Sequence, residues 1–70
     1  MIDRPAFITD YIAAYLAANP GHPEPEFEGP NARGWYSVIA GTEPAFVTRV
    51  SPAGLIEMTA RLRARVEAAL

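Results

Sequence analysis

The stretch that decides the fold is GWYSVIAGTEPAFVTRV, residues 34–50. Its two halves, residues 34–40 and 45–50, are rich in aromatic and β-branched side chains, which favour extended strands. Between them, Gly41-Thr42-Glu43-Pro44 has the composition of a turn. The stretch therefore predicts an antiparallel hairpin with a four-residue loop. Neither strand alternates strictly between apolar and polar residues, so the pattern does not decide which face is buried.

A helix is predicted immediately after the hairpin, over residues 52–69. Ser51 is a favoured N-cap residue, and Pro52 suits the first helical position because its missing N–H group has no helical partner there. Apolar residues then recur at helical spacing on one stripe. These are Leu55, Met58, Leu62 and Val66, continued by Ala69 and Leu70.

A second helix is predicted near the start of the chain, over residues 4–19. Asp3 is the expected N-cap, Pro5 is tolerated in the first turn, and Asn19-Pro20-Gly21 ends the helix. One face is a wide apolar stripe of Phe7, Ile8, Tyr11, Ile12, Tyr15 and Leu16. The opposite face is small and flat, with Ala6, Thr9, Asp10, Ala13 and Ala17.

The proline-rich segment between the first helix and the hairpin favours extended backbone. We expect residues 24–28 to add a short edge strand with Phe27 pointing inward and Glu24, Glu26 and Glu28 pointing the other way. A hairpin alone is marginally stable, so both helices should cover one face of the sheet. The sequence thus predicts a single α+β domain over residues 1–70, in the order helix, short edge strand, antiparallel hairpin, helix.

The composition points away from several classes of function. The chain has no cysteine, and hence neither a disulfide nor a thiolate metal site. It has no apolar run of about 18 residues, and its first residues lack the basic region of a signal peptide, so we expect a cytoplasmic protein. The single histidine, His22, lies in a loop without an evident nucleophile or orienting partner. We therefore expect a non-enzyme without catalytic residues, bound metal or cofactor.

The charges are unevenly distributed along the chain, whose net charge is −2. Residues 1–30 are acidic, whereas residues 31–70 contain Arg33, Arg49, Arg61, Arg63 and Arg65. On the last helix, Arg61 and Arg65 share one flank and Arg63 lies on the other, and Glu57 is placed to pair with Arg61. The arginines therefore do not form one basic face, and we expect weak or no binding to nucleic acid.

The element order is similar to that of double-stranded RNA-binding domains. The lysine-rich entry to the last helix of that family is replaced here by Ser51-Pro52-Ala53-Gly54-Leu55-Ile56. The sequence therefore does not predict membership of that family.

The acidic edge is the basis of the predicted function. Alternate residues of a strand repeat at about 6–7 Å, roughly the spacing of successive phosphates along a nucleic-acid strand. Glu24, Glu26 and Glu28 could therefore engage arginines of a nucleic-acid-binding partner. We predict a non-catalytic protein-binding module, specifically a small phage- or mobile-element-encoded inhibitor or accessory protein of the anti-CRISPR kind. Of the adjacent Trp35 and Tyr36, the exposed one is expected to be an aromatic anchor.

Three other interpretations remain open. The glutamates could serve only to protect a sheet edge from aggregation. The protein could be a small nucleic-acid-binding transcriptional regulator that uses Arg33, Arg49, Arg61 and Arg65. It could also be a structural or assembly protein that dimerises through the small face of the first helix, at Asp10, Ala13 and Ala17.

Overall fold

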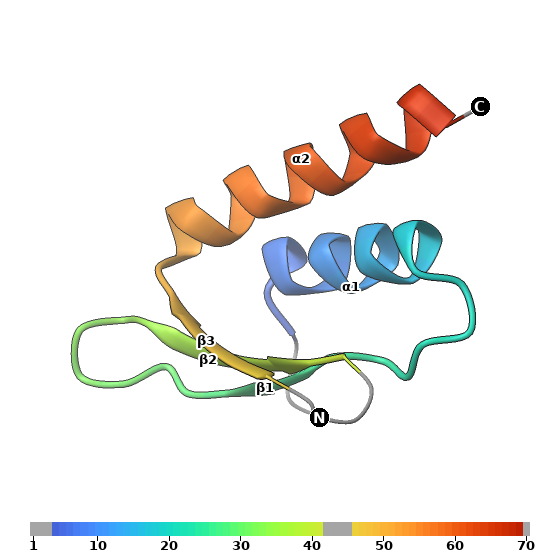
Figure 1. Cartoon of the computed structure of the whole chain (residues 1–70). Helices are drawn as coiled ribbons and strands as arrows, with labels where there is room; N and C mark the ends of the chain where they lie inside the picture. The colour runs from blue at the N-terminus through green and yellow to red at the C-terminus, as the bar shows by residue number, and fades with distance from the viewer. Residues whose placement is uncertain (1–3, 42–45, 70) are drawn as a thin grey trace.

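The computed structural model describes residues 4–41 and 46–69. The elements are α1 (Ala6–Ala18), β1 (Glu26–Glu28), β2 (Tyr36–Ala40), β3 (Phe46–Val50) and α2 (Pro52–Ala69). The strands form one antiparallel sheet in the order β1-β2-β3, with β2 in the centre. Both helices lie on the same side of this sheet (Figure 1). The predicted α+β architecture is therefore confirmed.

The strand register separates two faces of the sheet. Phe27 of β1 is opposite Val38 of β2, which is opposite Thr48 of β3, and this row faces the helices. Because side chains alternate along a strand, the neighbouring positions face the other way. These are Glu26 and Glu28 on β1, Ser37 and Ile39 on β2, and Val47 and Arg49 on β3. We call the side of the sheet away from the helices the open face.

Aromatic side chains join α1 to the sheet. The Phe7 ring meets the Tyr36 ring edge to face at 5.8 Å between centroids, and the Tyr11 ring meets Phe27 at the same distance. Edge-to-face pairs of this kind add to the stabilisation from burial alone. The buried core combines α1, the sheet and the start of α2 in Ile8, Tyr11, Ile12, Tyr15, Val38, Ala40, Val50 and Leu55.

The helix α2 packs mainly against α1 and touches the sheet through β3. Its first turn is capped as predicted, because Ser51 Oγ accepts a hydrogen bond from the Gly54 N–H at 3.1 Å. Leu55 is fully buried, and the Thr59 hydroxyl donates to the Leu55 carbonyl at 2.9 Å. None of the described residues from Ala60 onward is buried, so the second half of α2 is held less firmly.

Several predicted boundaries differ from the structure. The strand predicted over residues 34–40 begins at Tyr36, and the helix predicted over residues 4–19 spans Ala6–Ala18. The edge strand begins at Glu26, not at residue 24, because buried Pro25 has no N–H group to donate to β2 and the chain leaves the sheet there. Helix α1 begins at Ala6, and Pro5 occupies the N-cap position without a side-chain cap. The expected N-cap, Asp3, lies outside the described residues, as do Leu70 and residues 42–45 of the hairpin loop.

Candidate functional site

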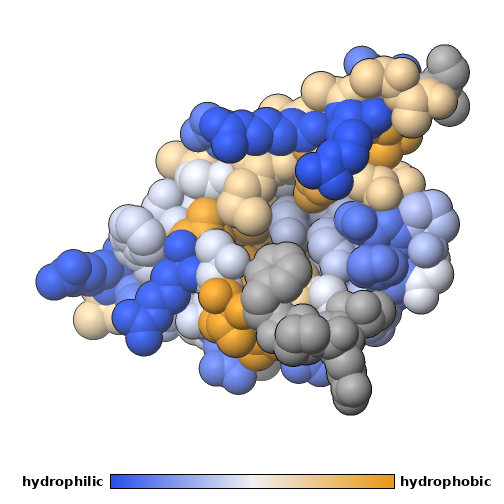
Figure 2. Space-filling view, in the orientation of Figure 1, coloured by the Kyte–Doolittle hydropathy of each residue, from blue (hydrophilic) through white to orange (hydrophobic). Residues whose placement is uncertain are grey.

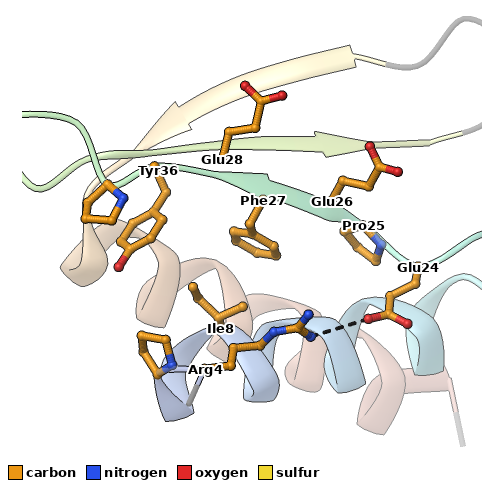
Figure 3. Close-up of a pocket in the computed structure, with 11 residues that line it drawn as sticks. Arg4, Ile8, Glu24, Pro25, Glu26, Phe27, Glu28 and Tyr36 are labelled. Atoms are coloured by element: carbon orange, nitrogen blue, oxygen red, sulfur yellow. Dashed lines mark hydrogen bonds and ion pairs between the residues drawn. The ribbon is translucent and has the colours of Figure 1, made fainter. Parts of the chain in front are cut away.

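The predicted row of three glutamates consists of two residues on the sheet and one beside it. Glu26 and Glu28 point to the open face, away from Phe27 (Figure 3). Glu24 precedes β1, and its carboxylate accepts a hydrogen bond from Arg4 Nη1 at 3.4 Å. Among the described residues neither Glu26 nor Glu28 has an ion-pair partner. The acidic edge therefore contributes to the open face two carboxylates that have no ion-pair partner in residues 4–41 and 46–69.

Of the two adjacent aromatic residues, Trp35 is the exposed one. Tyr36 faces the helices and packs on Phe7, so its predicted role as a partner contact is not supported by its position. Trp35 is 43% exposed and precedes Ser37 by two residues, which places it on the open-face side of β2. The indole can therefore serve as the aromatic anchor that was expected of one of the pair.

The loop before β2 holds Trp35 in place. The Asn31 side-chain oxygen accepts hydrogen bonds from the backbone N–H groups of Arg33 at 2.9 Å and Trp35 at 3.0 Å. The Asn31 N–H in turn donates to the Trp35 carbonyl at 2.9 Å. Gly29 lies against this turn with φ of 116°, and a Cβ atom there would lie 3.0 Å from the Trp35 carbonyl oxygen. Glycine is required at this position by both the backbone conformation and the space.

A hollow of about 260 Å³ lies beside Trp35 and follows one cross-strand row of the open face. Glu28 and Arg49 stand at the two ends of this row, with Ser37 between them. One end of the row is thus negative and the other positive, while the centre is neutral.

The next row of the open face is more apolar. Glu26 is opposite Ile39, which is opposite Val47, and Val47 is 64% exposed. Figure 2 shows an apolar group on the surface over β3, beside hydrophilic side chains. Ser37, Ile39 and Val47 were not among the predicted site residues, because the sequence pattern does not decide which face of the sheet is buried.

The arginines of the alternative nucleic-acid site do not come together. Arg49 lies on the open face and Arg33 in the loop before β2. Arg61 and Arg65 belong to α2, which is on the opposite side of the sheet, and Arg61 Nη2 lies 2.9 Å from Glu57 Oε1. The predicted Glu57–Arg61 pair is therefore present, and the four arginines are divided between two sides of the molecule.

The small face of α1 is exposed but partly bordered by α2. Asp10 lies 3.9 Å from Arg63 of α2, beside a groove lined by Phe7, Ile56, Thr59 and Ala60. Ala13 and Ala17 are both exposed. The predicted dimerisation face is thus accessible, although its charged member Asp10 already has a partner.

His22 packs against Tyr15 of α1. The Tyr15 hydroxyl lies 3.1 Å from His22 Nδ1, and the two rings meet edge to face. The described residues contain no group of three side chains able to hold a metal ion. None of the helices among them is long and apolar enough to cross a membrane.

A larger, open hollow of about 990 Å³ lies between β1 and the start of α1 (Figure 3). Ile8, Phe27 and Tyr36 line it, and the Arg4–Glu24 ion pair crosses its margin.

Burial and the neighbouring Tyr15 raise the pKa of Tyr11 above that of a free tyrosine. Tyr11 belongs to the core between α1 and Phe27, so this shift concerns stability and not a binding site.

Comparisons of the chain with models of protein families, with curated proteins and with solved structures found no match.

Proposed function

We propose that the protein is a non-catalytic protein-binding module that docks on its partner through the open face of the sheet. The observation that carries this proposal is the exposure of Trp35 and Val47 beside two carboxylates that lack a partner among the described residues. An exposed aromatic residue flanked by polar groups is typical of an interface anchor. Such a surface binds another molecule by shape and charge and requires no reacting group.

The partner in this proposal presents a basic surface. Glu26 and Glu28 stand on alternate positions of β1, so their spacing is about 6–7 Å. Arginine and lysine side chains that bind successive phosphates have a similar spacing. These carboxylates favour a more specific proposal. The protein is an inhibitor or accessory protein that occupies a nucleic-acid-binding surface of its partner, as anti-CRISPR proteins do. We place this function in the cytoplasm, since a chain without cysteine needs no oxidising compartment.

The test begins with a partner identified by co-purification from the native host. Replacing Glu26 and Glu28 together by lysine should slow association with that partner strongly and weaken or reverse its salt dependence, because like charges then meet. The matched control replaces Glu57 and Glu67 of α2, which are exposed on the other side of the sheet, and should leave the association rate unchanged.

A second variant tests the anchor separately. Trp35→Ala should raise the dissociation rate and change the association rate little. If the Glu26/Glu28 variant keeps the wild-type association rate while circular dichroism shows it folded, the acidic contact is wrong. The glutamates then only protect the sheet edge.

A further inference from the structure

The open face has a charge pattern that is complementary to itself. In the row Glu28–Ser37–Arg49, the carboxylate is on edge strand β1 and the guanidinium on edge strand β3. We infer that a second copy of this chain covers the open face when no other partner does. This inference does not depend on the proposed function, because it concerns the protein alone.

The symmetry of such a dimer follows from the strand order. Two sheets that pack face to face lie about 10 Å apart with their strands roughly aligned. A two-fold axis parallel to the central strand β2 places β1 of one copy over β3 of the other and keeps each row in register. Glu28 of each copy then lies over Arg49 of the other, which forms two equivalent ion pairs.

The other face-to-face arrangement is disfavoured by the same charges. A two-fold axis across the strands would exchange the two rows and place Glu28 over Glu26 of the second copy. Like charges held together at an interface are destabilising. The charge pattern therefore selects the axis parallel to β2.

This axis also brings together the apolar residues on and beside the central strand. Ile39 lies on β2 and Trp35 directly before it, so each meets its own counterpart near the axis. Val47, which is 64% exposed in a single copy, lies over Glu26 of the other copy at the side of this contact and can pack only on the methylene part of that side chain. The result is an apolar centre with ion pairs at its margin, the usual arrangement of an interface.

The size of the open face indicates a weak dimer. The strands have three, five and five residues and together cover a face of at most about 14 Å by 17 Å. The area of this face is well below the ~800 Å² that each partner contributes to a standard interface. We therefore expect reversible association with a dissociation constant of about 10⁻⁴ M. In a weak dimer of this kind Glu28 and Trp35 are covered. A partner that binds the same face more tightly displaces the second copy.

Sedimentation equilibrium of the purified chain at low salt, up to about 1 mM, tests the inference. The wild-type protein should show a monomer–dimer equilibrium that shifts toward monomer as salt is added. Glu28→Arg and Arg49→Glu should each weaken the dimer about tenfold or more, because each puts like charges opposite each other twice. Glu57→Arg makes the same charge change as Glu28→Arg on α2 and should leave the equilibrium unchanged.

The decisive measurement mixes the two single variants. The Glu28→Arg chain has two positive row ends and the Arg49→Glu chain two negative ones, so an equimolar mixture should associate although neither variant does so alone. A wild-type chain that stays monomeric at about 1 mM overturns the inference. A mixture that fails to associate also overturns it, as does a dimer insensitive to both variants. If that dimer is broken by Ala13→Glu instead, the interface is the small face of α1.

Discussion

Gly54 illustrates, at the scale of one residue, how a close contact outweighs helix propensity. Glycine costs up to about 1 kcal/mol relative to alanine in a helix, and Gly54 lies in the first turn of α2. The structure explains its presence in α2, because a Cβ atom at this position would lie 2.8 Å from Val50 Cγ2 and 3.3 Å from Ser51 Oγ. Val50 is buried at the end of β3 and cannot move aside freely. Gly54 therefore allows α2 to start directly against the sheet.

We predict that Gly54→Ala destabilises the protein by about 1–3 kcal/mol, although the same change stabilises an open helix. Urea unfolding followed by circular dichroism measures the effect. In a Val50→Ala background the crowding atom is gone, so Gly54→Ala should then be neutral or stabilising. A gain in stability from Gly54→Ala in the wild-type background would contradict the argument.

Tyr11 gives a prediction for alkaline pH. A tyrosine in the unfolded chain loses its proton near pH 10, whereas burial and Tyr15 raise the pKa of folded Tyr11. Between the two values the folded state holds more protons than the unfolded state, so the free energy of unfolding falls as the pH rises. The stabilisation is complete below pH 10 and is lost as the pH rises through the raised pKa.

Tyr11→Phe should therefore make the urea midpoint less dependent on pH between about 9 and 11. Tyr36→Phe, which removes a tyrosine hydroxyl at the hollow beside β1, is the matched control. If the urea midpoint of Tyr11→Phe falls with pH as steeply as that of the wild-type protein, the raised pKa of Tyr11 is not the cause of the fall.

At the scale of the elements, α2 divides into a firmly packed first half and a loosely packed second half. Leu55 is fully buried, whereas Leu62 and Val66 on the same stripe are half-buried. The helical stripe itself was predictable from the sequence, because the spacing of its apolar residues is regular. How deeply each of them is buried was not, because that depends on where α1 ends beneath α2.

We predict that Leu55→Ala costs about 2–5 kcal/mol and Leu62→Ala about half as much or less. The unfolding midpoints of the two variants in urea provide the comparison. The prediction fails if the two substitutions destabilise the protein equally. Amide hydrogen exchange should agree, with faster exchange in the last two turns of α2 than around Leu55 and Thr59.

The strands show where the sequence did and did not determine the site. Their positions follow from β-branched and aromatic composition, and the hairpin was predicted correctly in the described residues except that its first strand begins at Tyr36 and not at residue 34. The buried face was not predictable, because apolar Ile39 and Val47 point outward while Thr48 lies on the helix side. The residues that obscured the pattern are the ones that make the open face apolar. Glu24 was misplaced because the strand begins only after Pro25, at Glu26.

On the scale of the whole molecule, the sheet lies between the helices and the open face and so separates the arginines of α2 from the charged residues of the open face. Helix α2 carries Arg61 and Arg65 on one side, and the open face carries Arg49 with Glu26 and Glu28 on the other. A nucleic acid following either side would meet few unpaired cations, since Arg61 is paired with Glu57 and Arg63 lies near Asp10. The net charge of −2 opposes binding in addition.

We therefore predict no submicromolar binding to duplex DNA or RNA at physiological salt. Fluorescence anisotropy with a labelled duplex of each kind, repeated over a range of salt, measures it. A protein that neutralises several phosphates loses affinity steeply as salt rises, because bound counterions are released. Submicromolar affinity with such a slope would favour the regulator interpretation, and the Arg33, Arg49, Arg61 and Arg65 variants would then show which side contacts the phosphates. Weak binding that is independent of those four arginines would favour the proposed role of the open face as a protein contact, through the two carboxylates that have no ion-pair partner among the described residues.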